Sequence, residues 1–117
     1  MAKPKIGLHV SGALGLEKAP LRARALGCEC FQFFSRSPRG GGAPPISAAT
    51  SLAFRTASAR YGLRSFIHAP YYINFASSNH RISFGSVSAV REELFRGTIL
   101  GARFVMTHLG SASDLGE

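Results

Sequence analysis

Residues 65–77, SFIHAPYYINFAS, determine the predicted fold of the chain. In this segment a short apolar run leads directly into His68, and a loop rich in proline, tyrosine and asparagine follows. Such a run is typical of a buried strand that delivers its last residue to a functional loop. The pattern recurs at residues 104–111, where a second apolar run leads into His108 and a Leu-Gly-Ser loop. Taken alone, each histidine is better explained as a hydrogen-bonded core residue. The repetition is what favours His68 and His108 as neighbouring ligands of one metal site.

The bulk composition is that of one globular domain. The chain has 117 residues, of which 45% are hydrophobic and 17% are charged, and this length suits a single domain. No segment reaches the run of about 18 apolar residues that a membrane span requires. The basic N-terminus is not followed by the apolar core of a secretory signal, so we expect a cytoplasmic protein with no membrane partner. Cys28 and Cys30 are too close on one strand to form an unstrained disulfide, and we interpret them as small buried hydrophobes.

The charge balance favours an anionic partner. Lysine and arginine together number 14 against 6 aspartates and glutamates, which gives a net charge of +8. Basic residues that contact phosphates release condensed counterions, and this suits a nucleic-acid partner. A basic surface also occurs in proteins that never bind nucleic acid, so charge alone does not identify the partner.

Hydrophobic periodicity predicts alternating strands and helices along the chain. The predicted strands cover residues 5–10, 30–34, 64–67 and 103–107. The predicted helices cover residues 16–26, a segment from Ser47 to Gly62, and a segment that carries Val87, Val90 and Leu94 on its apolar side and ends at Gly101. In the third helix, Glu92 and Arg96 are predicted to form an exposed i,i+4 pair. Residues 35–45, with three glycines and three prolines, are predicted to be a loop.

The resulting order, βαβαβαβ, predicts an α/β fold. Strands that are apolar on both faces and alternate with helices are typical of a parallel sheet covered by helices. Such architectures carry their chemistry at the carboxyl ends of the strands. The glycine-rich turn at 11–15, the loop at 35–45, His68 and His108 all fall at that edge.

Four motifs of the chain resemble those of the endonuclease IV family, in the same order and spacing. They are IGLHVS at residues 6–11, CFQFF at 30–34 followed by SPR at 37–39, HAPYYIN at 68–74, and THLGS at 107–111. The segment at 68–74 is the most specific of the four, and the similarity covers essentially the whole chain.

The resemblance implies a zinc-dependent apurinic/apyrimidinic endonuclease built on a (β/α)8 TIM barrel. It implies that His68 and His108 are ligands of a Zn2+ cluster, and that the partner is double-stranded DNA with abasic sites. Arg39 aligns with an arginine that the family inserts into DNA, and Tyr71 and Tyr72 align with the pair that probes the abasic gap. His9 lies beside the site in the family, and we do not carry it over as a ligand.

The residues themselves are consistent with this chemistry. Neutral imidazole binds zinc well, and wedge side chains such as Arg39, Tyr71 and Tyr72 suit a kinked duplex. The residues also allow simpler explanations. Arg39 is equally well explained as a solvated loop cation, and the two tyrosines as a packing pair on the rim of the sheet.

The length of the chain departs from the family. A complete barrel needs about 250 residues, whereas this chain has four predicted strands. The resemblance therefore implies that residues 1–117 form the amino-terminal half of a barrel, about four βα units, with the missing carboxyl-terminal half as a further partner. Such a fragment is expected to be inactive alone. The family's other zinc ligands are absent, since Glu29, Asp114 and Glu117 do not replace them. We expect the inner face of the half-barrel to expose Ile6, Phe33, Ile67 and Val105.

Two other functions remain open. One is a metal-dependent sugar isomerase or epimerase on the same kind of barrel, against which the arginine loop and the tyrosine pair argue. The other is a non-catalytic remnant that binds DNA through its charge.

Overall fold

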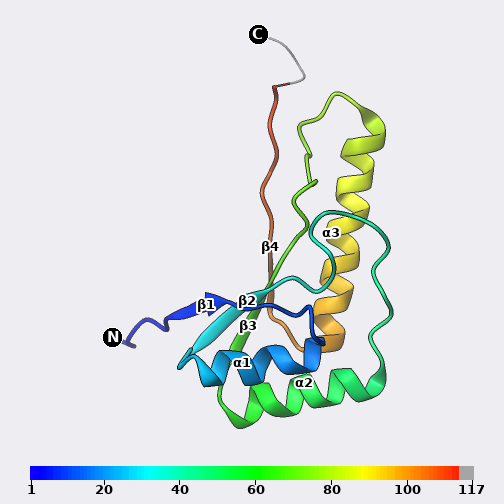
Figure 1. The fold of residues 1–117 in the computed structure, drawn as a ribbon. Coiled ribbons are helices and arrows are strands. Elements are labelled where there is room, and N and C mark those ends of the chain that lie inside the picture. The colour runs from blue at the N-terminus through cyan, green and yellow to red at the C-terminus, as the bar shows by residue number, and fades with distance from the viewer. Residues whose placement is uncertain (114–117) are drawn as a thin grey trace.

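The computed structural model describes residues 1–113 and consists of four parallel strands with helices packed against them (Figure 1). The elements in chain order are β1 (Gly7–His9), the 3-10 turn η1 (Leu16–Lys18), α1 (Ala19–Ala25), β2 (Cys30–Phe33), α2 (Ala48–Arg60), β3 (Arg64–His68), α3 (His80–Leu100) and β4 (Phe104–Met106). The strands lie in the order β1-β2-β3-β4, and every neighbouring pair is parallel. The predicted parallel α/β fold is therefore confirmed.

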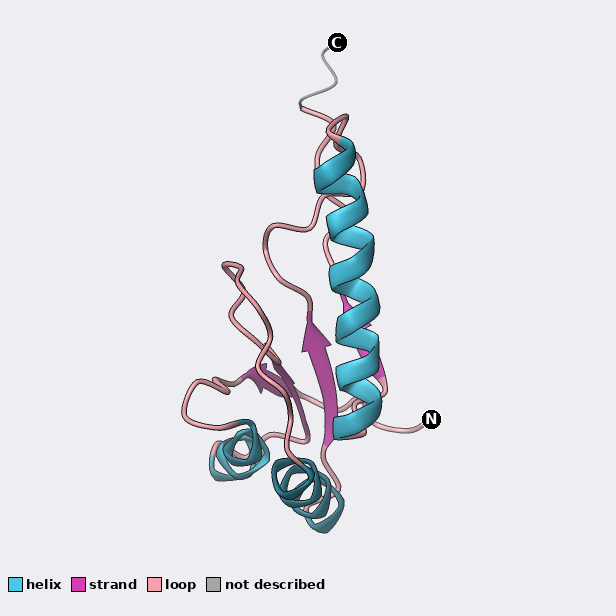
Figure 2. Ribbon diagram, turned by 90° about the vertical axis from the view of Figure 1, so that its right-hand side faces the viewer, coloured by secondary structure: helices cyan, strands magenta, loops and turns pink. Residues whose placement is uncertain are grey.

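The helices lie on one face of the sheet. Helices α1 and α2 lie next to one another, and the longer α3 runs beside β3 and β4 (Figure 2). The core between helices and sheet contains Phe31 and Phe33 of β2, Phe54 of α2 and Ile67 of β3, all at most 1% exposed. The rings of Phe33 and Phe54 lie 5.2 Å apart between centroids. Each of these buried side chains contributes about 1.5–3 kcal/mol to stability.

The opposite face of the sheet is open. Phe66 and Phe104 stack there with ring centroids 5.3 Å apart, and Phe104 is 53% exposed. The prediction that Phe33, Ile67 and Val105 face this side is wrong. Phe33 and Ile67 have no exposed surface in the core under the helices, and Val105 packs against the same core. The cause is the two-residue period of a strand, which puts Phe66 on the same face as His68 and Ile67 on the other.

The predicted helix ends are confirmed. The side chain of Ser47 accepts a hydrogen bond of 3.0 Å from the backbone N–H of Thr50 and caps α2. Gly62 follows α2 with φ 62°, and Gly101 ends α3 with φ 74°. Glycine adopts these left-handed angles without the steric penalty that a side chain adds. The start of the third helix was not predicted. Helix α3 begins at His80, and the side chain of Asn79 caps it by accepting a hydrogen bond from the N–H of Arg81.

The predicted apolar side of α3 is right for Val90, which packs against the core, and wrong for Val87 and Leu94. Val87 and Leu94 are each 55% exposed, whereas Glu93 has no exposed surface and Arg96 is 4% exposed. The prediction that Glu92 and Arg96 form an exposed pair is also wrong, because Arg96 is buried. Sequence periodicity assigned the apolar residues to the core, but ion pairs that form only in the folded chain hold the charged residues there.

The remaining predictions concern the cysteines, membrane spans and two acidic residues near the end of the sequence. Both cysteines are free, and Cys28 is buried whereas Cys30 is half-buried. Within residues 1–113, none of the helices combines the length and the apolar character needed to cross a bilayer. Asp114 and Glu117 lie outside the described residues.

Candidate metal and nucleic-acid site

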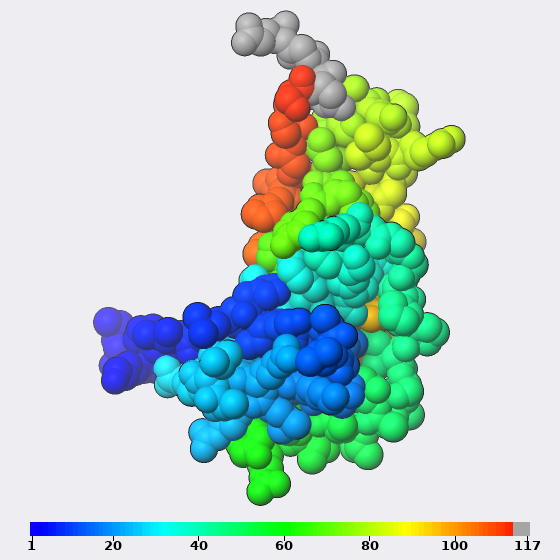
Figure 3. All heavy atoms as spheres, viewed as in Figure 1, coloured from blue at the N-terminus to red at the C-terminus, as the bar shows by residue number. Residues whose placement is uncertain are grey.

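The loops that follow the four strands meet at the carboxyl edge of the sheet. A cavity of about 1020 Å³ opens between the loops after β1 and β2, and its lining includes His9, Phe34, Arg36 and Arg39. The loop after β2 lies against the loop after β3, where the backbone N–H of Tyr71 donates a 2.9 Å hydrogen bond to the carbonyl of Pro38 (Figure 3). The sheet thus gathers segments that are far apart in sequence at the edge where the sequence predicts the chemistry.

His68 and His108 lie next to each other at this edge. Their ring centroids are 5.2 Å apart, and the planes are tilted by 55°. Two imidazoles that share a tetrahedral zinc, each with a nitrogen about 2 Å from the metal, place their centroids about 5 Å apart. The expected convergence of the two side chains is therefore present in the structure.

The surroundings of His68 fix the chemistry of its ring. Its side chain is buried, with 7% exposed, and Nδ1 lies 2.6 Å from the carbonyl oxygen of Ala69. A carbonyl only accepts, so Nδ1 is the donor, and in the neutral tautomer that this selects Nε2 keeps a free lone pair. A histidine oriented in this way by a backbone carbonyl is typical of metal ligands.

His9 has a different role in the same cluster. Its ring lies 6.4 Å from that of His68 and 4.6 Å from that of Phe34. The side-chain amide of Gln32 donates to Nδ1 of His9 over 3.0 Å, so the neutral ring presents N–H rather than a lone pair at Nε2. Burial and the neighbouring His68 lower the pKa of His9 and favour this neutral form. In this form His9 is suited to donate a hydrogen bond toward the site.

The histidine pair fits part of a zinc site. Among residues 1–113 no group of three or more histidine, cysteine, aspartate or glutamate side chains could hold a metal ion. A tetrahedral zinc has about four ligands, so His68 and His108 can provide half of them. The other ligands have to come from solvent or from donors outside these residues.

A hydrogen-bonded clasp holds the loop after His108. The side chain of Asn74 donates to the carbonyl of Ser111 and accepts from the N–H of Ser111, both over 3.1 Å. Gly110 lies against this clasp with φ 109°, and a Cβ there would overlap the Asn74 carboxamide. Because the clasp joins the loops after β3 and β4, Asn74 and Gly110 fix the position of His108 relative to His68.

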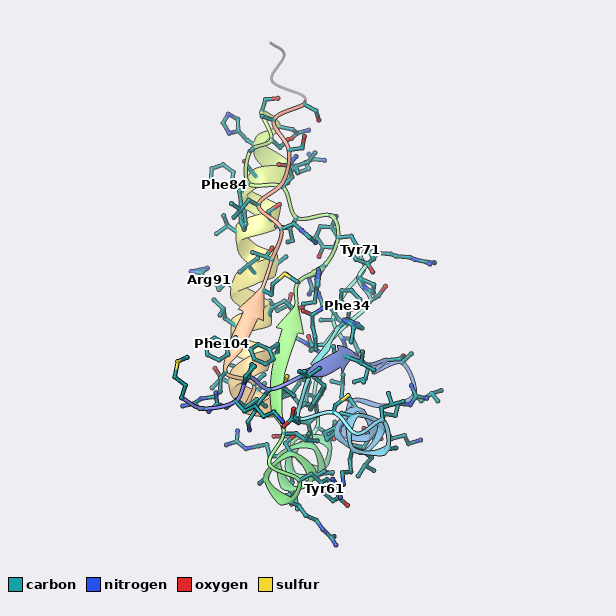
Figure 4. All side chains as sticks on the ribbon, turned by 90° about the vertical axis from the view of Figure 1, so that its left-hand side faces the viewer. Phe34, Tyr61, Tyr71, Phe84, Arg91 and Phe104 are labelled. Atoms are coloured by element: carbon teal, nitrogen blue, oxygen red, sulfur yellow. The ribbon has the colours of Figure 1, made fainter. Side chains whose placement is uncertain are left out.

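Of the predicted DNA-contacting residues, Tyr71 lies against the histidine cluster. Arg39 is exposed, and Tyr71 and Tyr72 are 62% and 41% exposed. The ring of Tyr71 lies 5.2 Å from that of Phe34 and 6.1 Å from that of His68, so it extends from the histidine cluster into solvent (Figure 4).

Sequence reasoning missed a buried charge network behind these loops. The hydroxyl of Ser35 donates to Glu93 over 2.5 Å, and Arg96 donates to the same hydroxyl over 2.8 Å. Arg36 pairs with Glu92 over 2.5 Å and with Glu93 over 3.0 Å. Burial raises the pKa of the Glu93 carboxyl, although Ser35 and the two arginines act in the opposite direction. The sequence did contain one sign of this network, since Glu93, Arg96 and the small Gly97 are spaced to lie on one side of a helix.

Comparisons with known proteins place the chain in a family. Residues 20–117 match the family described as Xylose isomerase-like TIM barrel. The chain is 40% identical over 107 residues to a protein named Probable endonuclease 4 from Methanosphaerula palustris, covering 91% of this chain and 37% of that protein. It is 38% identical over 113 residues to a protein of the same name from Thermoplasma acidophilum, covering 96% of this chain and 40% of that protein.

Solved structures agree with these sequence matches. The crystal structure of endonuclease IV from Thermus thermophilus superposes with a TM-score of 0.84 at 35% identity and covers 92% of this chain and 41% of that one. A D-tagatose 3-epimerase-like protein superposes with a TM-score of 0.61 at 20% identity, covering 90% of this chain and 38% of that one, and this likeness concerns the fold alone. The chain thus spans about two fifths of the length of the relatives that it matches. It belongs to the xylose isomerase-like TIM barrel family, and its four parallel strands with their helices correspond to the amino-terminal part of an endonuclease IV-type barrel.

Proposed function

We propose that this chain is the amino-terminal part of a zinc-dependent DNA-repair hydrolase that acts in the cytoplasm and cleaves the phosphodiester bond 5′ to abasic sites. Residues 1–117 would form a partial barrel domain of that enzyme. The observation that carries the proposal is the pairing of His68 and His108 at 5.2 Å, beside exposed Tyr71 and Tyr72. The similarity to proteins named Probable endonuclease 4 supports the choice of reaction.

In this proposal His68 and His108 bind Zn2+ through nitrogen lone pairs. The hydrogen bond from Nδ1 of His68 to Ala69 selects the tautomer that leaves Nε2 free to bind. When bound, zinc lowers the pKa of a coordinated water and polarises the phosphodiester oxygens. His9, with N–H presented at Nε2, would donate a hydrogen bond to an anionic oxygen of the substrate or of bound solvent.

Arg39, Tyr71 and Tyr72 are the proposed contacts with double-stranded DNA. A guanidinium at the carboxyl edge can neutralise backbone phosphates, and the net charge of +8 supports such binding. Exposed aromatic rings beside the metal ligands suit insertion into a duplex at a site where one base is missing, because unstacking is easiest there. In the completed enzyme, we expect Arg39→Ala to weaken lesion binding more than it weakens zinc binding. Equal loss of both would indicate a structural role for Arg39.

A separate carboxyl-terminal half of the barrel is the proposed partner of this chain. Two histidines provide half of a tetrahedral zinc site, and Phe104 and Met106 expose apolar surface on the open face of the sheet. Interior layers of a complete barrel receive side chains from all the strands around it. We therefore expect this chain alone to bind zinc weakly and to have no incision activity.

Two assays test these statements. Zinc binding is measured by calorimetry for the chain and for a variant with both His68→Ala and His108→Ala. Incision is measured on a duplex with one abasic site and on an intact duplex of the same sequence, with zinc supplied, before and after addition of a separately expressed carboxyl-terminal half. We expect activity only on the abasic duplex and only after mixing.

The results also separate the other two functions. Zinc binding without preference for abasic DNA would favour a sugar isomerase or epimerase. Equal affinity for both duplexes without zinc binding would favour a DNA-binding remnant. Robust incision by the chain alone would overturn the proposed need for a second half.

A further inference from the structure

Arg36 occupies a position that the proposed reaction does not explain. It lies in the loop after β2, three residues before Arg39, yet its side chain is only 6% exposed. The loss of hydration of a guanidinium buried to this degree has to be compensated by paired charges and hydrogen bonds, since an unpaired buried charge is strongly destabilising. The contacts of Arg36 therefore indicate what it holds in place.

The guanidinium of Arg36 uses three nitrogens for three partners. Nε lies 3.0 Å from a carboxylate oxygen of Glu93, Nη1 donates to Glu92 over 2.5 Å, and Nη2 donates to the hydroxyl of Tyr72 over 2.7 Å. Two of these partners lie on α3, and the third lies in the loop after β3. Arg36 thus connects three separate segments of the chain through one rigid, planar group.

The helix side of this connection is itself fixed. Glu93 has no exposed surface and accepts from the hydroxyl of Ser35, which in turn accepts from Arg96. Arg96 also donates to the carbonyl of Pro44 over 2.7 Å and thereby ties the far end of the same loop to α3. The buried network therefore provides a firm support against which Arg36 can orient Tyr72.

The loop side carries the proposed DNA contacts. Tyr72 exposes 41% of its surface while its hydroxyl is held by Arg36, so its orientation is restrained although the ring remains accessible. The neighbouring Tyr71 is linked through its N–H to Pro38, immediately before Arg39. One set of contacts thus restrains the segments that carry Arg39, Tyr71 and Tyr72.

We propose that Arg36 is a positioning residue, which holds the Tyr72 ring in one orientation against α3 so that it is preorganised to contact DNA at a lesion. This inference rests on the proposed function for its role in recognition, but the restraint on Tyr72 can be measured without DNA. Lysine keeps the charge but carries all its N–H groups on one nitrogen. It therefore cannot reach the three separate partners of the planar guanidinium together.

The first experiment measures the restraint directly. The chain contains three tyrosines, and 3-fluorotyrosine labelling gives each a 19F resonance that Tyr→Phe variants assign. We expect Arg36→Lys to shift and broaden the Tyr72 resonance, whereas the matched control Arg91→Lys, on the side of α3 away from Tyr71, leaves it unchanged (Figure 4). An unchanged Tyr72 resonance in Arg36→Lys would overturn the inference, whatever the function of the protein.

The second experiment is carried out with the carboxyl-terminal half added, and it measures recognition as the ratio of affinities for an abasic and an intact duplex of the same sequence. We expect this ratio to fall about tenfold in Arg36→Lys and by a similar factor in Tyr72→Phe, because each removes a hydrogen bond to a charged group. The double variant should show no further loss, since both substitutions break the same contact. General destabilisation would lower both affinities and leave the ratio unchanged.

The outcomes separate the inference from the proposed function. If the wild-type chain mixed with its carboxyl-terminal half does not prefer the abasic duplex, the proposed function is contradicted, and the 19F result still decides whether Arg36 restrains Tyr72. Additive losses in the double variant would contradict the positioning role while leaving the proposed function intact. If Arg36→Lys does not fold, Tyr72→Phe alone decides, because it leaves the ion pairs of Arg36 in place; an unchanged ratio in that variant would overturn the inference.

Discussion

On the helix-covered face of the sheet Phe33 and Ile67 expose no surface, whereas on the open face Phe104 exposes 53% and Met106 exposes 37%. Both faces carry apolar side chains, but only the covered one is packed against other parts of the described chain. Burial of apolar surface is what stabilises a fold, so the covered face should dominate the stability of residues 1–113. The open face leads at its carboxyl end to His68 and His108. Stability and the candidate chemistry therefore reside on opposite sides of the same strands.

The strongest test of this difference is Phe33→Ala. The ring of Phe33 packs against those of Phe31 and Phe54, at centroid distances of 5.6 and 5.2 Å. Its removal leaves a cavity that the rigid sheet cannot close, and we expect the free energy of unfolding to fall by about 3–5 kcal/mol. Urea denaturation followed by circular dichroism measures the change. A loss below about 1 kcal/mol would show that the covered face does not dominate stability.

The second prediction concerns the polar part of the covered face, through Arg96→Met. Methionine fills a similar volume but leaves Glu93 without one of its cationic neighbours and the carbonyls of Ser35 and Pro44 without their donor. We expect a loss of about 3 kcal/mol in the free energy of unfolding, because the remaining buried charge is less well compensated. The matched control is Arg91→Met on the same helix, which is exposed and should change stability by less than about 0.5 kcal/mol. Equal effects of the two substitutions would contradict a structural role for the buried network.

The third prediction tests the edge at which the two faces meet. Gly110→Ala introduces a Cβ at φ 109° that overlaps the side chain of Asn74. We expect a stability loss of about 1–3 kcal/mol from backbone strain, together with weaker zinc binding because His108 is displaced. Calorimetry with zinc and thermal unfolding measure the two effects. Unchanged zinc affinity in a destabilised variant would show that the clasp does not position His108.

The smallest effect is expected on the open face, for Phe104→Thr. Threonine is β-branched and so keeps a high preference for a strand, and it removes a ring that is already 53% exposed. We expect the free energy of unfolding to change by less than about 1 kcal/mol. A loss comparable with that of Phe33→Ala would mean that Phe104 is covered in solution, and light scattering of the wild-type chain would then reveal self-association.

The elements of the fold could be predicted because their signals are local. The apolar runs before His68 and His108 are short and bounded by loops, and Ser47, Gly62 and Gly101 mark helix ends through their own backbone and side-chain chemistry. The meeting of the two histidines followed from the parallel order of the strands. The resemblance indicated Arg39, Tyr71 and Tyr72 as contacts, and the structure describes their exposure without testing their role.

The errors concern properties that depend on distant residues. Whether Glu93 and Arg96 face solvent depends on Ser35 and Arg36, which lie on another segment of the chain. No periodicity within α3 contains that information. The assignment of Phe33 and Ile67 to the open face had a different cause, since the position of His68 already determines by alternation which residues of β3 share its face.

The loop after β3 forms hydrogen bonds with the loops on both sides of it. Tyr71 bonds to Pro38 in the loop after β2, and Asn74 and Phe75 bond to Ser111 and Leu109 in the loop after β4. These links restrict where the chain can accept added residues. An insertion between 69 and 75 would break the connections on both sides together, whereas the glycines at 40–42 take part in none of them. Natural or engineered variation in loop length should therefore concentrate at 40–42, and the segment that carries HAPYYIN should keep its length.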